Sequence, residues 1–216
     1  MSAQSAVTLP TLDYERRYWS RALLVAGVDE AGRGALAGPV VAGAVILPRD
    51  CAHAGIWQRV RDSKQISAAQ REEYAPEIRS AALAWAVGEA SPGEIDADGI
   101  APATRRAMMR ALAALFPAPD ALLIDWVRLP LVNLPQESLA RADATIVSVA
   151  AASILAKVHR DEIMRACAPN FPAYCFETNK GYGTAAHLAV LAFQGPCTLH
   201  RKTFAPIGAP RTLFEG

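Results

Sequence analysis

Two apolar runs of strand length, joined by a short stretch of acids and glycines, constrain the fold of this chain most. The first run is 23–28 (LLVAGV), and the second is 39–47 (PVVAGAVIL), which is rich in β-branched residues. Runs of this length and composition predict buried strands. Because the connection between them is short, we expect the two strands to be antiparallel neighbours in one sheet.

Downstream, further strand-like runs alternate with segments of helical composition. No internal repeat or linker interrupts this alternation, which predicts an α/β protein. We expect one domain over 1–216, with an N-terminal lead-in to about residue 20 and a small helical C-terminal extension from about residue 165. The further predicted strands are 83–90 and 121–124. The predicted helices are 67–80 with Ser67 as N-cap, a short helix from Ser91, 100–116, 143–164 and 184–193. The segment between the strand 121–124 and the helix 143–164, which contains Pro130 and Pro135, is predicted to be irregular.

Composition and charge narrow the class of protein. Hydrophobic residues make up 52% of the chain, which supports a sizeable core and excludes a disordered protein. The formal net charge is +1, so binding to nucleic acid depends on a local basic patch. The 4 cysteines form no Cys-x-x-Cys pair, which argues against zinc and fits a reducing compartment. Neither a signal peptide nor a membrane span is recognisable, so we expect a cytoplasmic protein.

The glycines between the first two strands invite comparison with a dinucleotide-binding loop, but their spacing excludes it. Gly32, Gly34 and Gly38 give G-x-G-x-x-x-G rather than G-x-G-x-x-G. A dinucleotide-binding loop also opens a helix, whereas Pro39 and the β-branched residues after it predict a strand. Two carboxylates directly before the glycines would moreover repel a diphosphate.

Four carboxylates stand at the ends of predicted core elements: Asp29, Glu30, Asp125 and Asp143. If they meet at one edge of the sheet, their mutual repulsion favours a hard divalent cation, which prefers oxygen ligands. Simpler interpretations are a strand end for Asp125, a helix N-cap for Asp143 and a solvated turn for the first two. Because adjacent residues of a regular strand point to opposite faces, Asp29 and Glu30 reach one site only if the strand bends there.

Six segments carry a pattern far more specific than any lone glycine motif. They are VAGVDEAGRGALAGPVVAGAVIL (25–47), DSKQIS (62–67), LLID (122–125), ADATIVSVAAASILAKVHRD (142–161), NKGYGTAAH (179–187) and GPCTLHRKTFAPI (195–207). In this order they resemble type 2 ribonuclease H, in its bacterial form ribonuclease HII. The resemblance implies a ribonuclease H-like fold: a mixed five-stranded sheet flanked by helices, with a helical C-terminal extension.

The resemblance also implies a reaction and the residues that perform it. The reaction is endonucleolytic hydrolysis of RNA in RNA–DNA hybrids and cleavage 5′ of ribonucleotides embedded in duplex DNA, leaving 3′-hydroxyl and 5′-phosphate ends. The resemblance implies that two Mn²⁺ or Mg²⁺ ions are held by Asp29, Glu30, Asp125 and Asp143. It implies that the ribose 2′-hydroxyl is read by Gly32, Arg33 and Gly34, and that Tyr182 packs on the sugar at the RNA–DNA junction. The candidates for phosphate contacts are Lys64, Lys180, Arg201 and Lys202.

Other residues are expected to stay outside the chemistry. Lys157 and Arg160 are predicted only to dress the exposed end of their helix, and His159, His187 and His200 receive no catalytic role. We expect a monomer, with a sliding clamp as a candidate partner at the C-terminal end.

The chain departs from the family pattern at three positions: Ala35 for a proline, Trp126 for a glycine and Ala142 for a glycine. None of these changes removes a ligand. Trp126 is the most relevant to the site, because its bulk is expected to reshape the approach to Asp125.

Overall fold

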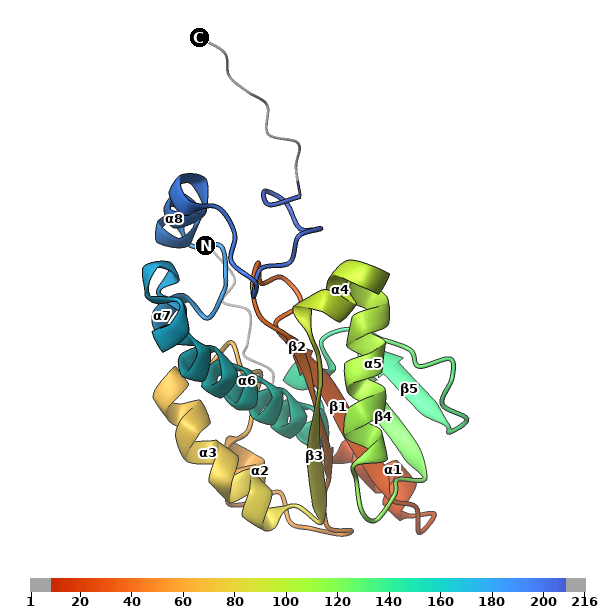
Figure 1. The fold of residues 1–216 in the computed structure, drawn as a ribbon. Coiled ribbons are helices and arrows are strands. Elements are labelled where there is room, and N and C mark those ends of the chain that lie inside the picture. Colours follow the sequence, from red (N-terminus) through yellow and green to blue (C-terminus); the bar gives the residue numbers. More distant parts are fainter. Residues whose placement is uncertain (1–8, 209–216) are drawn as a thin grey trace, which may run out of the picture.

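A mixed five-stranded sheet forms the centre of the computed structural model, which describes residues 9–208 (Figure 1). The strand order is β3-β2-β1-β4-β5, with antiparallel pairs on the β3-β2-β1 side and parallel pairs on the β1-β4-β5 side. Both the mixed sheet and the antiparallel pairing of the first two strands confirm the predictions. The strands are β1 (Val25–Ala31), β2 (Val40–Ile46), β3 (Ala84–Ala90), β4 (Ala121–Asp125) and β5 (Gln136–Leu139).

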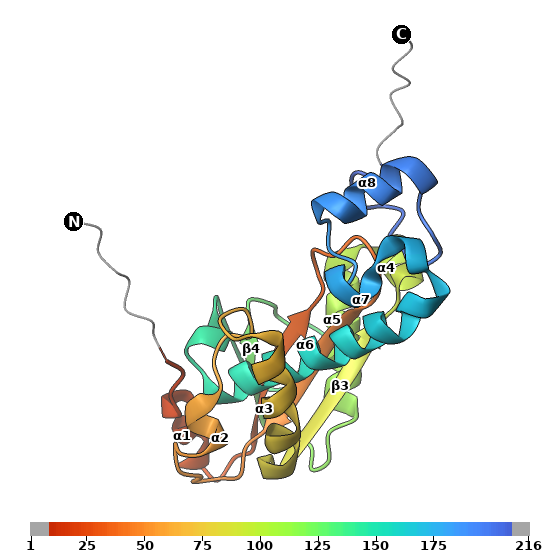
Figure 2. The ribbon, with the colours of Figure 1, turned by 90° about the vertical axis from the view of Figure 1, so that its left-hand side faces the viewer.

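Helices cover both faces of this sheet (Figures 1 and 2). The long helix α6 packs across β1 and β2 on one face together with α3, whereas α5 packs on the other face against β2 and β3. The α-helices are α1 (Asp13–Trp19), α2 (Ile56–Arg59), α3 (Ala68–Ala81), α4 (Pro92–Asp98), α5 (Ile100–Ala113), α6 (Val147–Cys167), α7 (Phe176–Asn179) and α8 (Ala185–Gln194), and the 3-10 helices are η1 (Ala142–Ala144), η2 (Ala168–Asn170) and η3 (Pro172–Tyr174).

Glycines in the two central strands allow α6 to lie unusually close to the sheet. A Cβ added at Gly27 would lie 2.3 Å from the backbone carbon of Ser148, and one at Gly43 would lie 2.3 Å from the carbonyl oxygen of Ala152. Neither distance is compatible with a side chain, because backbone atoms of a packed helix cannot give way. The close approach brings the residues of α6 within reach of the end of β1.

Local sequence signals account for several helix starts. Ser67 and Ser91 each form a capping box, with Gln70 and Glu94 as the partners three residues on. Thr184 caps α8 by accepting a hydrogen bond from the His187 N–H. These ends agree with the predicted ones to within a residue.

Two parts of the region between β4 and α6 differ from expectation. Residues 126–141 were expected to be irregular, yet they contain β5, whose polar sequence QESL pairs with β4 at the sheet edge. Asp143 was expected within the buried helix or as its N-cap. It lies instead in η1, and α6 begins at Val147 after Ile146, which makes no side-chain cap.

The N-terminal lead-in contains the helix α1, whose Trp19 is buried in the core.

The C-terminal extension is tied by backbone hydrogen bonds to the loop between β1 and β2 (Figure 2). The Leu36 N–H donates to the Gly181 carbonyl over 2.8 Å, and the Gly38 N–H donates to the Leu199 carbonyl over 2.8 Å. The extension therefore stands at the end of the sheet where β1 ends. Across residues 9–208, every helix is too short or too polar to cross a lipid bilayer.

Candidate active site

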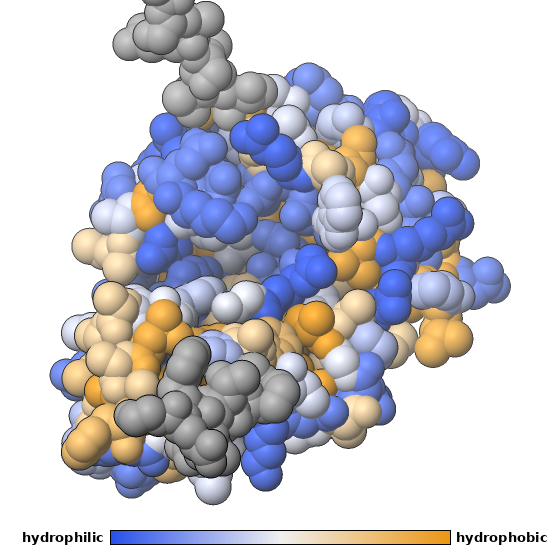
Figure 3. Space-filling view, turned by 90° about the horizontal axis from the view of Figure 1, so that it is seen from above, coloured by the Kyte–Doolittle hydropathy of each residue, from blue (hydrophilic) through white to orange (hydrophobic). Residues whose placement is uncertain are grey.

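A cavity of about 270 Å³ opens where β1 and β4 end. Asp29, Glu30 and Asp125 line one part of it, and Tyr182 and Lys64 line another. Seen from above, this end of the molecule is hollowed and its surface is largely hydrophilic (Figure 3). The structure thus brings residues from four separate sequence segments to one place.

The acids of β1 reach one cavity, although the pairing of β1 with β2 shows no bulge at the point where we considered a bend necessary. The register with β2 runs without interruption through Ala31↔Val41, so Asp29 and Glu30 do point to opposite faces of a regular strand. The pairing with β4, however, stops at Val28↔Ile124, and β4 itself ends at Asp125. Glu30 therefore has no pairing partner in β4, and the sheet is open beside it. The carboxylates of Asp29 and Glu30, which start from opposite faces of β1, both reach the cavity at this open end.

Asp29 is the most deeply buried of the four acids, with 3% of its surface exposed. Its Oδ1 accepts a hydrogen bond of 2.7 Å from the Glu30 N–H. Burial, followed by repulsion from the Glu30 carboxylate, holds the pKa of Asp29 well above its ordinary value. An ionised carboxylate at this position therefore needs a cation nearby.

Glu30 has one carboxylate oxygen that is paired and one that is not. Its Oε1 accepts from Arg33 Nη1 at 3.3 Å, whereas its Oε2 is buried without a hydrogen-bond partner. Burial raises the pKa of this carboxyl, and the Arg33 guanidinium opposes that rise. A buried carboxylate oxygen without a partner is costly unless a ligand or ion satisfies it.

Of the remaining two acids, Asp125 lines the same cavity, whereas Asp143 is not among the lining residues. Asp125 accepts a 2.7 Å hydrogen bond from the Ala142 N–H, and burial raises the pKa of its carboxyl. Asp143 is 4% exposed, and burial together with the neighbouring Asp62 carboxylate raises its pKa to about 6. Lys64 Nζ lies 3.7 Å from Asp143 Oδ2 and so partly balances this group.

These acids fit a hard divalent cation in their chemistry, although their present arrangement is not a closed ligand shell. All donors are carboxylate oxygens, their pKa values are raised, and one buried oxygen has no partner. Among the residues that the structure describes, no group of three His, Cys, Asp or Glu side chains is close enough to hold a metal.

The Gly32–Gly34 segment leaves β1 in a conformation that two buried arginines hold. Gly32 has φ +91°, and a Cβ there would lie 2.0 Å from Arg160 Nε. Arg201 donates to the carbonyl oxygens of Gly32 (2.7 Å) and Arg33 (2.8 Å) and, twice, to that of Gly38. Arg201 is fully buried, so the prediction that it contacts a phosphate is wrong: its donors are occupied by the loop.

Arg160 is likewise buried rather than exposed at the end of its helix, which corrects the prediction for this residue. Its guanidinium donates at 2.9 Å to the carbonyls of Pro39, Ala37 and Lys180. It also lies 5.1 Å from the centre of the Tyr182 ring. One side chain therefore joins the loop after β1 to the loop that carries the tyrosine.

Tyr182 is further held by a pair of buried histidines. The Cys197 N–H donates to His200 Nδ1, so the proton of neutral His200 is on Nε2. His200 Nε2 lies 3.0 Å from His187 Nε2, and His187 Nδ1 lies 2.9 Å from the Tyr182 carbonyl oxygen, which can only accept. Burial lowers the pKa of His200 to about 4, which keeps this chain of donors neutral and pointing in one direction.

The predicted basic residues differ in their access to the cavity. Lys64 lines it, and Arg33 does too, whereas Lys180 Nζ donates to the carbonyl of Glu177. Lys202 is exposed, and its backbone N–H donates to Asp96, outside the cavity lining. Of the predicted phosphate contacts, only Lys64 lies in the cavity.

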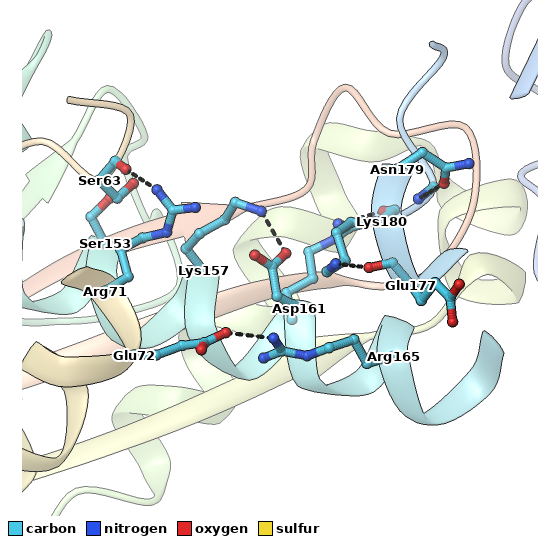
Figure 4. A network of polar contacts seen from close by, with 12 residues as sticks. Ser63, Arg71, Glu72, Ser153, Lys157, Asp161, Arg165, Glu177, Asn179 and Lys180 are labelled. Atoms are coloured by element: carbon cyan, nitrogen blue, oxygen red, sulfur yellow. Dashed lines mark hydrogen bonds and ion pairs between the residues drawn. The ribbon is translucent and has the colours of Figure 1, made fainter. Parts of the chain in front are cut away.

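Three polar residues of the cavity lining were not predicted: Ser63, Arg71 and Lys157. Ser63 Oγ lies 2.9 Å from Ser153 Oγ, and Lys157 reaches Asp161 one turn on along α6 (Figure 4). Lys157 Nζ also lies 5.5 Å from the centre of the Tyr182 ring. The only available signal for Lys157 was its position in the segment that resembles the family.

The order of the sheet, the carboxylates at the ends of its two central parallel strands and the helix packed across them define a protein of the ribonuclease H-like fold class. The family model described as ribonuclease HII matches residues 26–207, and the chain belongs to this family. Members act as endoribonucleases on RNA–DNA hybrids and depend on divalent metal ions.

Individual relatives support this assignment over most of the chain. Ribonuclease HII of Pelodictyon phaeoclathratiforme is 50% identical over 194 residues, which cover 89% of this chain and 94% of the relative. Ribonuclease HII of Bacillus subtilis is 50% identical over 184 residues, covering 85% and 70%.

Solved structures share the fold. Ribonuclease H2 from Pyrococcus horikoshii superposes with a TM-score of 0.71 at 24% identity, covering 86% of this chain and 96% of that one. The RNase HII in the PCNA complex from Archaeoglobus fulgidus gives a TM-score of 0.66 at 27% identity, covering 83% and 94%. The fold class predicted from the sequence is therefore confirmed.

Proposed function

We propose that this enzyme hydrolyses the RNA strand of RNA–DNA hybrids and cuts 5′ of single ribonucleotides embedded in duplex DNA. The observation that carries the proposal is the meeting of Asp29, Glu30 and Asp125 in one cavity that is also lined by the Gly32–Gly34 loop and Tyr182. A set of acids beside a sugar-recognition loop would place the cut next to the hydroxyl being read.

The four acids supply the metal site in this proposal. Asp29, Glu30, Asp125 and Asp143 would hold two Mn²⁺ or Mg²⁺ ions, and the partnerless Glu30 Oε2 supports a ligand role. When bound, such ions activate water and stabilise the leaving 3′ oxygen of the scissile phosphate. Water adds to phosphorus as the P–O3′ bond breaks, which leaves a 3′-hydroxyl on one fragment and a 5′-phosphate on the ribonucleotide.

Recognition of ribose is assigned to backbone and small residues. Gly34 is exposed, and a Cβ added there would meet nothing within 4 Å, so the sugar can approach its backbone closely. The 2′-hydroxyl is both donor and acceptor, and it is the group by which a protein tells RNA from DNA. Tyr182 would pack on the sugar at the junction, and Lys64 and Lys157 would face the scissile phosphate from the cavity wall.

The test is a set of three duplexes: one DNA duplex with a single ribonucleotide, one RNA–DNA hybrid and one all-DNA control. With Mn²⁺ or Mg²⁺ we expect cutting of the first two, loss of cutting with chelator, and no cutting in Asp29→Asn. Asp13→Asn, which changes an exposed acid, is the matched control and should cut normally. Binding without cutting under any metal would identify a non-catalytic binder of hybrids, and equal cutting of all-DNA would overturn the 2′-hydroxyl assignment.

Several broader features of the prediction remain part of this proposal. They are a single domain over 1–216, a monomeric state, a cytoplasmic location and a sliding clamp as partner. An archaeal relative is known in complex with PCNA, which supports the last of these. The terminal RTLFE stretch at 211–215, considered for such a contact, lies outside the described residues.

A further inference from the structure

Trp126 is unusual in both its backbone and its side chain. It follows Asp125 directly, has φ +58°, and leaves 67% of its surface exposed. The left-handed region is unfavourable for every residue with a Cβ, and an exposed indole gains nothing from the core. The strained position is nevertheless firmly held, because the Trp126 N–H donates to the Leu139 carbonyl over 2.9 Å. Strain kept in place beside a candidate catalytic acid points to a function.

The indole lines a small basic cavity next to the acid site. This cavity has a volume of about 120 Å³, and its lining includes Arg33, Arg105 and Arg128 but no acidic residue. Arg33 also lines the acid cavity, so the two cavities are neighbours that share this residue. Within residues 9–208, Arg105 and Arg128 form no ion pair, although Arg105 Nε donates to the Arg128 carbonyl at 3.2 Å.

We propose that Trp126, Arg105 and Arg128 form a second binding site for the substrate, which holds the nucleotide next to the one at the acids. The arginines bind its phosphate, and the indole packs on its sugar or base. Charge complementarity favours a polyanion as the occupant, since three arginines line the cavity and only Arg33 is paired with an acid, Glu30, among the residues that the structure describes. The shared residue Arg33, which puts this cavity next to the acid cavity, favours the strand that is being cut. The inference rests on the proposed function, because it assigns part of the same duplex.

The same contact explains why a bulky residue is tolerated at this position. Stacking on an aromatic ring is tolerant of sequence, because every base has a flat face. A substrate that covers the indole also removes the exposed apolar surface. The side chain is therefore expected to add affinity without adding base specificity, as a nuclease that cuts at any ribonucleotide requires.

Tryptophan fluorescence and binding are measured in chelator, so that the duplex with one ribonucleotide is bound but not cut. We expect this duplex to quench the fluorescence of the wild type, and Trp126→Gly to lose the quenching and bind about tenfold more weakly, which corresponds to about 1.4 kcal/mol. Trp85→Phe changes the exposed tryptophan of β3 and should keep both the affinity and the quenching. In the presence of metal, the loss in Trp126→Gly should fall on KM far more than on kcat.

The salt dependence of binding tests the arginines separately. Arg105→Gln and Arg128→Gln should each lower the slope of log affinity against log salt by about 0.9. Arg106→Gln is the matched control on the same helix, because Arg106 is paired with Glu94 and Asp98. Wild-type affinity or persistent quenching in Trp126→Gly would overturn the second binding site while leaving the proposed function intact. Conversely, normal binding and quenching without cutting under any metal would overturn the proposed function alone.

Discussion

Replacing Asp143 with asparagine should stabilise the metal-free protein and at the same time abolish its activity. Burial and the neighbouring Asp62 carboxylate raise the pKa of Asp143 from 3.8 to about 6. A rise of about two units corresponds to about 3 kcal/mol by which burial, and after it the Asp62 carboxylate, disfavour the charged form in the folded state, before discounting for solvent screening. Asparagine keeps the size of the side chain and removes the charge.

Two effects reduce the expected gain. Water near the cavity screens the repulsion, and the substitution also removes the attraction of Lys64, whose Nζ lies 3.7 Å away on a side chain that is 81% exposed. An exposed partner of this kind contributes about 0–1 kcal/mol. The net stabilisation is then about 1–2 kcal/mol, or about 2–8 °C in Tm for a chain of this length.

The pH dependence follows from the direction of the shift. An acid whose folded pKa lies above its unfolded value binds its proton more tightly when folded, so it destabilises the fold as pH rises. For Asp143 this cost starts near its ordinary pKa of 3.8, grows until about pH 6 and is constant above that. The advantage of Asp143→Asn should therefore be full at about pH 8 and be reduced by about half at pH 5.

Thermal unfolding in chelator, followed by circular dichroism, measures this difference. Asp96→Asn is the contrasting variant, because Asp96 accepts hydrogen bonds of 3.0 Å from the N–H groups of Lys202 and Thr203. Asparagine would turn a donor toward one of these groups and should lower stability by about 1–2 kcal/mol. An Asp143→Asn protein that unfolds at a lower temperature than the wild type at pH 8 would refute the idea of carboxylate repulsion in the site.

Three further predictions concern the loop after β1 and the metal. Gly32→Ala should lose both stability and activity, because the Cβ of the new alanine would lie 2.0 Å from Arg160 Nε. Gly34→Ala, whose Cβ would meet nothing within 4 Å, should fold normally and lose only the cutting of substrate. Urea unfolding and cleavage assays on both variants check this difference. Arg201→Lys should lower the free energy of unfolding by about 3–5 kcal/mol, because one ammonium group cannot replace the four hydrogen bonds that Arg201 donates to backbone carbonyls. A loss of less than about 1 kcal/mol would contradict the role of Arg201 in holding the loop after β1. Mn²⁺ should raise Tm more at pH 8 than at pH 5, because protons compete for the raised-pKa acids; an equal rise at both pH values would place the ion elsewhere.

Local signals in the sequence were sufficient for the elements that local interactions determine. Ser67 and Ser91 start helices because their side chains satisfy free N–H groups within the same turn. β5 was missed because three of its four residues are polar and none is fully buried, and its strand form depends on pairing with β4. An edge strand of this kind carries little hydrophobic pattern of its own.

The functional roles of the arginines could not be predicted from the sequence for a related reason. Arg201 was expected to contact a phosphate and Arg160 to dress the exposed end of its helix, because guanidinium groups usually lie at the surface or bind anions. Their actual acceptors are backbone carbonyls, and all but that of Lys180 belong to a loop more than a hundred residues away along the chain. The positions of Asp29, Glu30 and Asp125 were easier to predict, since the ends of β1 and β4 had to meet once these strands were parallel neighbours.

The central claim is that water, activated at the four acids, attacks the phosphate on the 5′ side of a ribonucleotide. Mass spectrometry of the products from a DNA duplex with one ribonucleotide tests it most directly. We predict a DNA fragment ending in a 3′-hydroxyl and a second fragment beginning with a 5′-phosphate on the ribonucleotide, both absent in Asp29→Asn. A product carrying a 2′,3′-cyclic phosphate would contradict the claim, because the 2′-hydroxyl would then be the nucleophile rather than the group recognised.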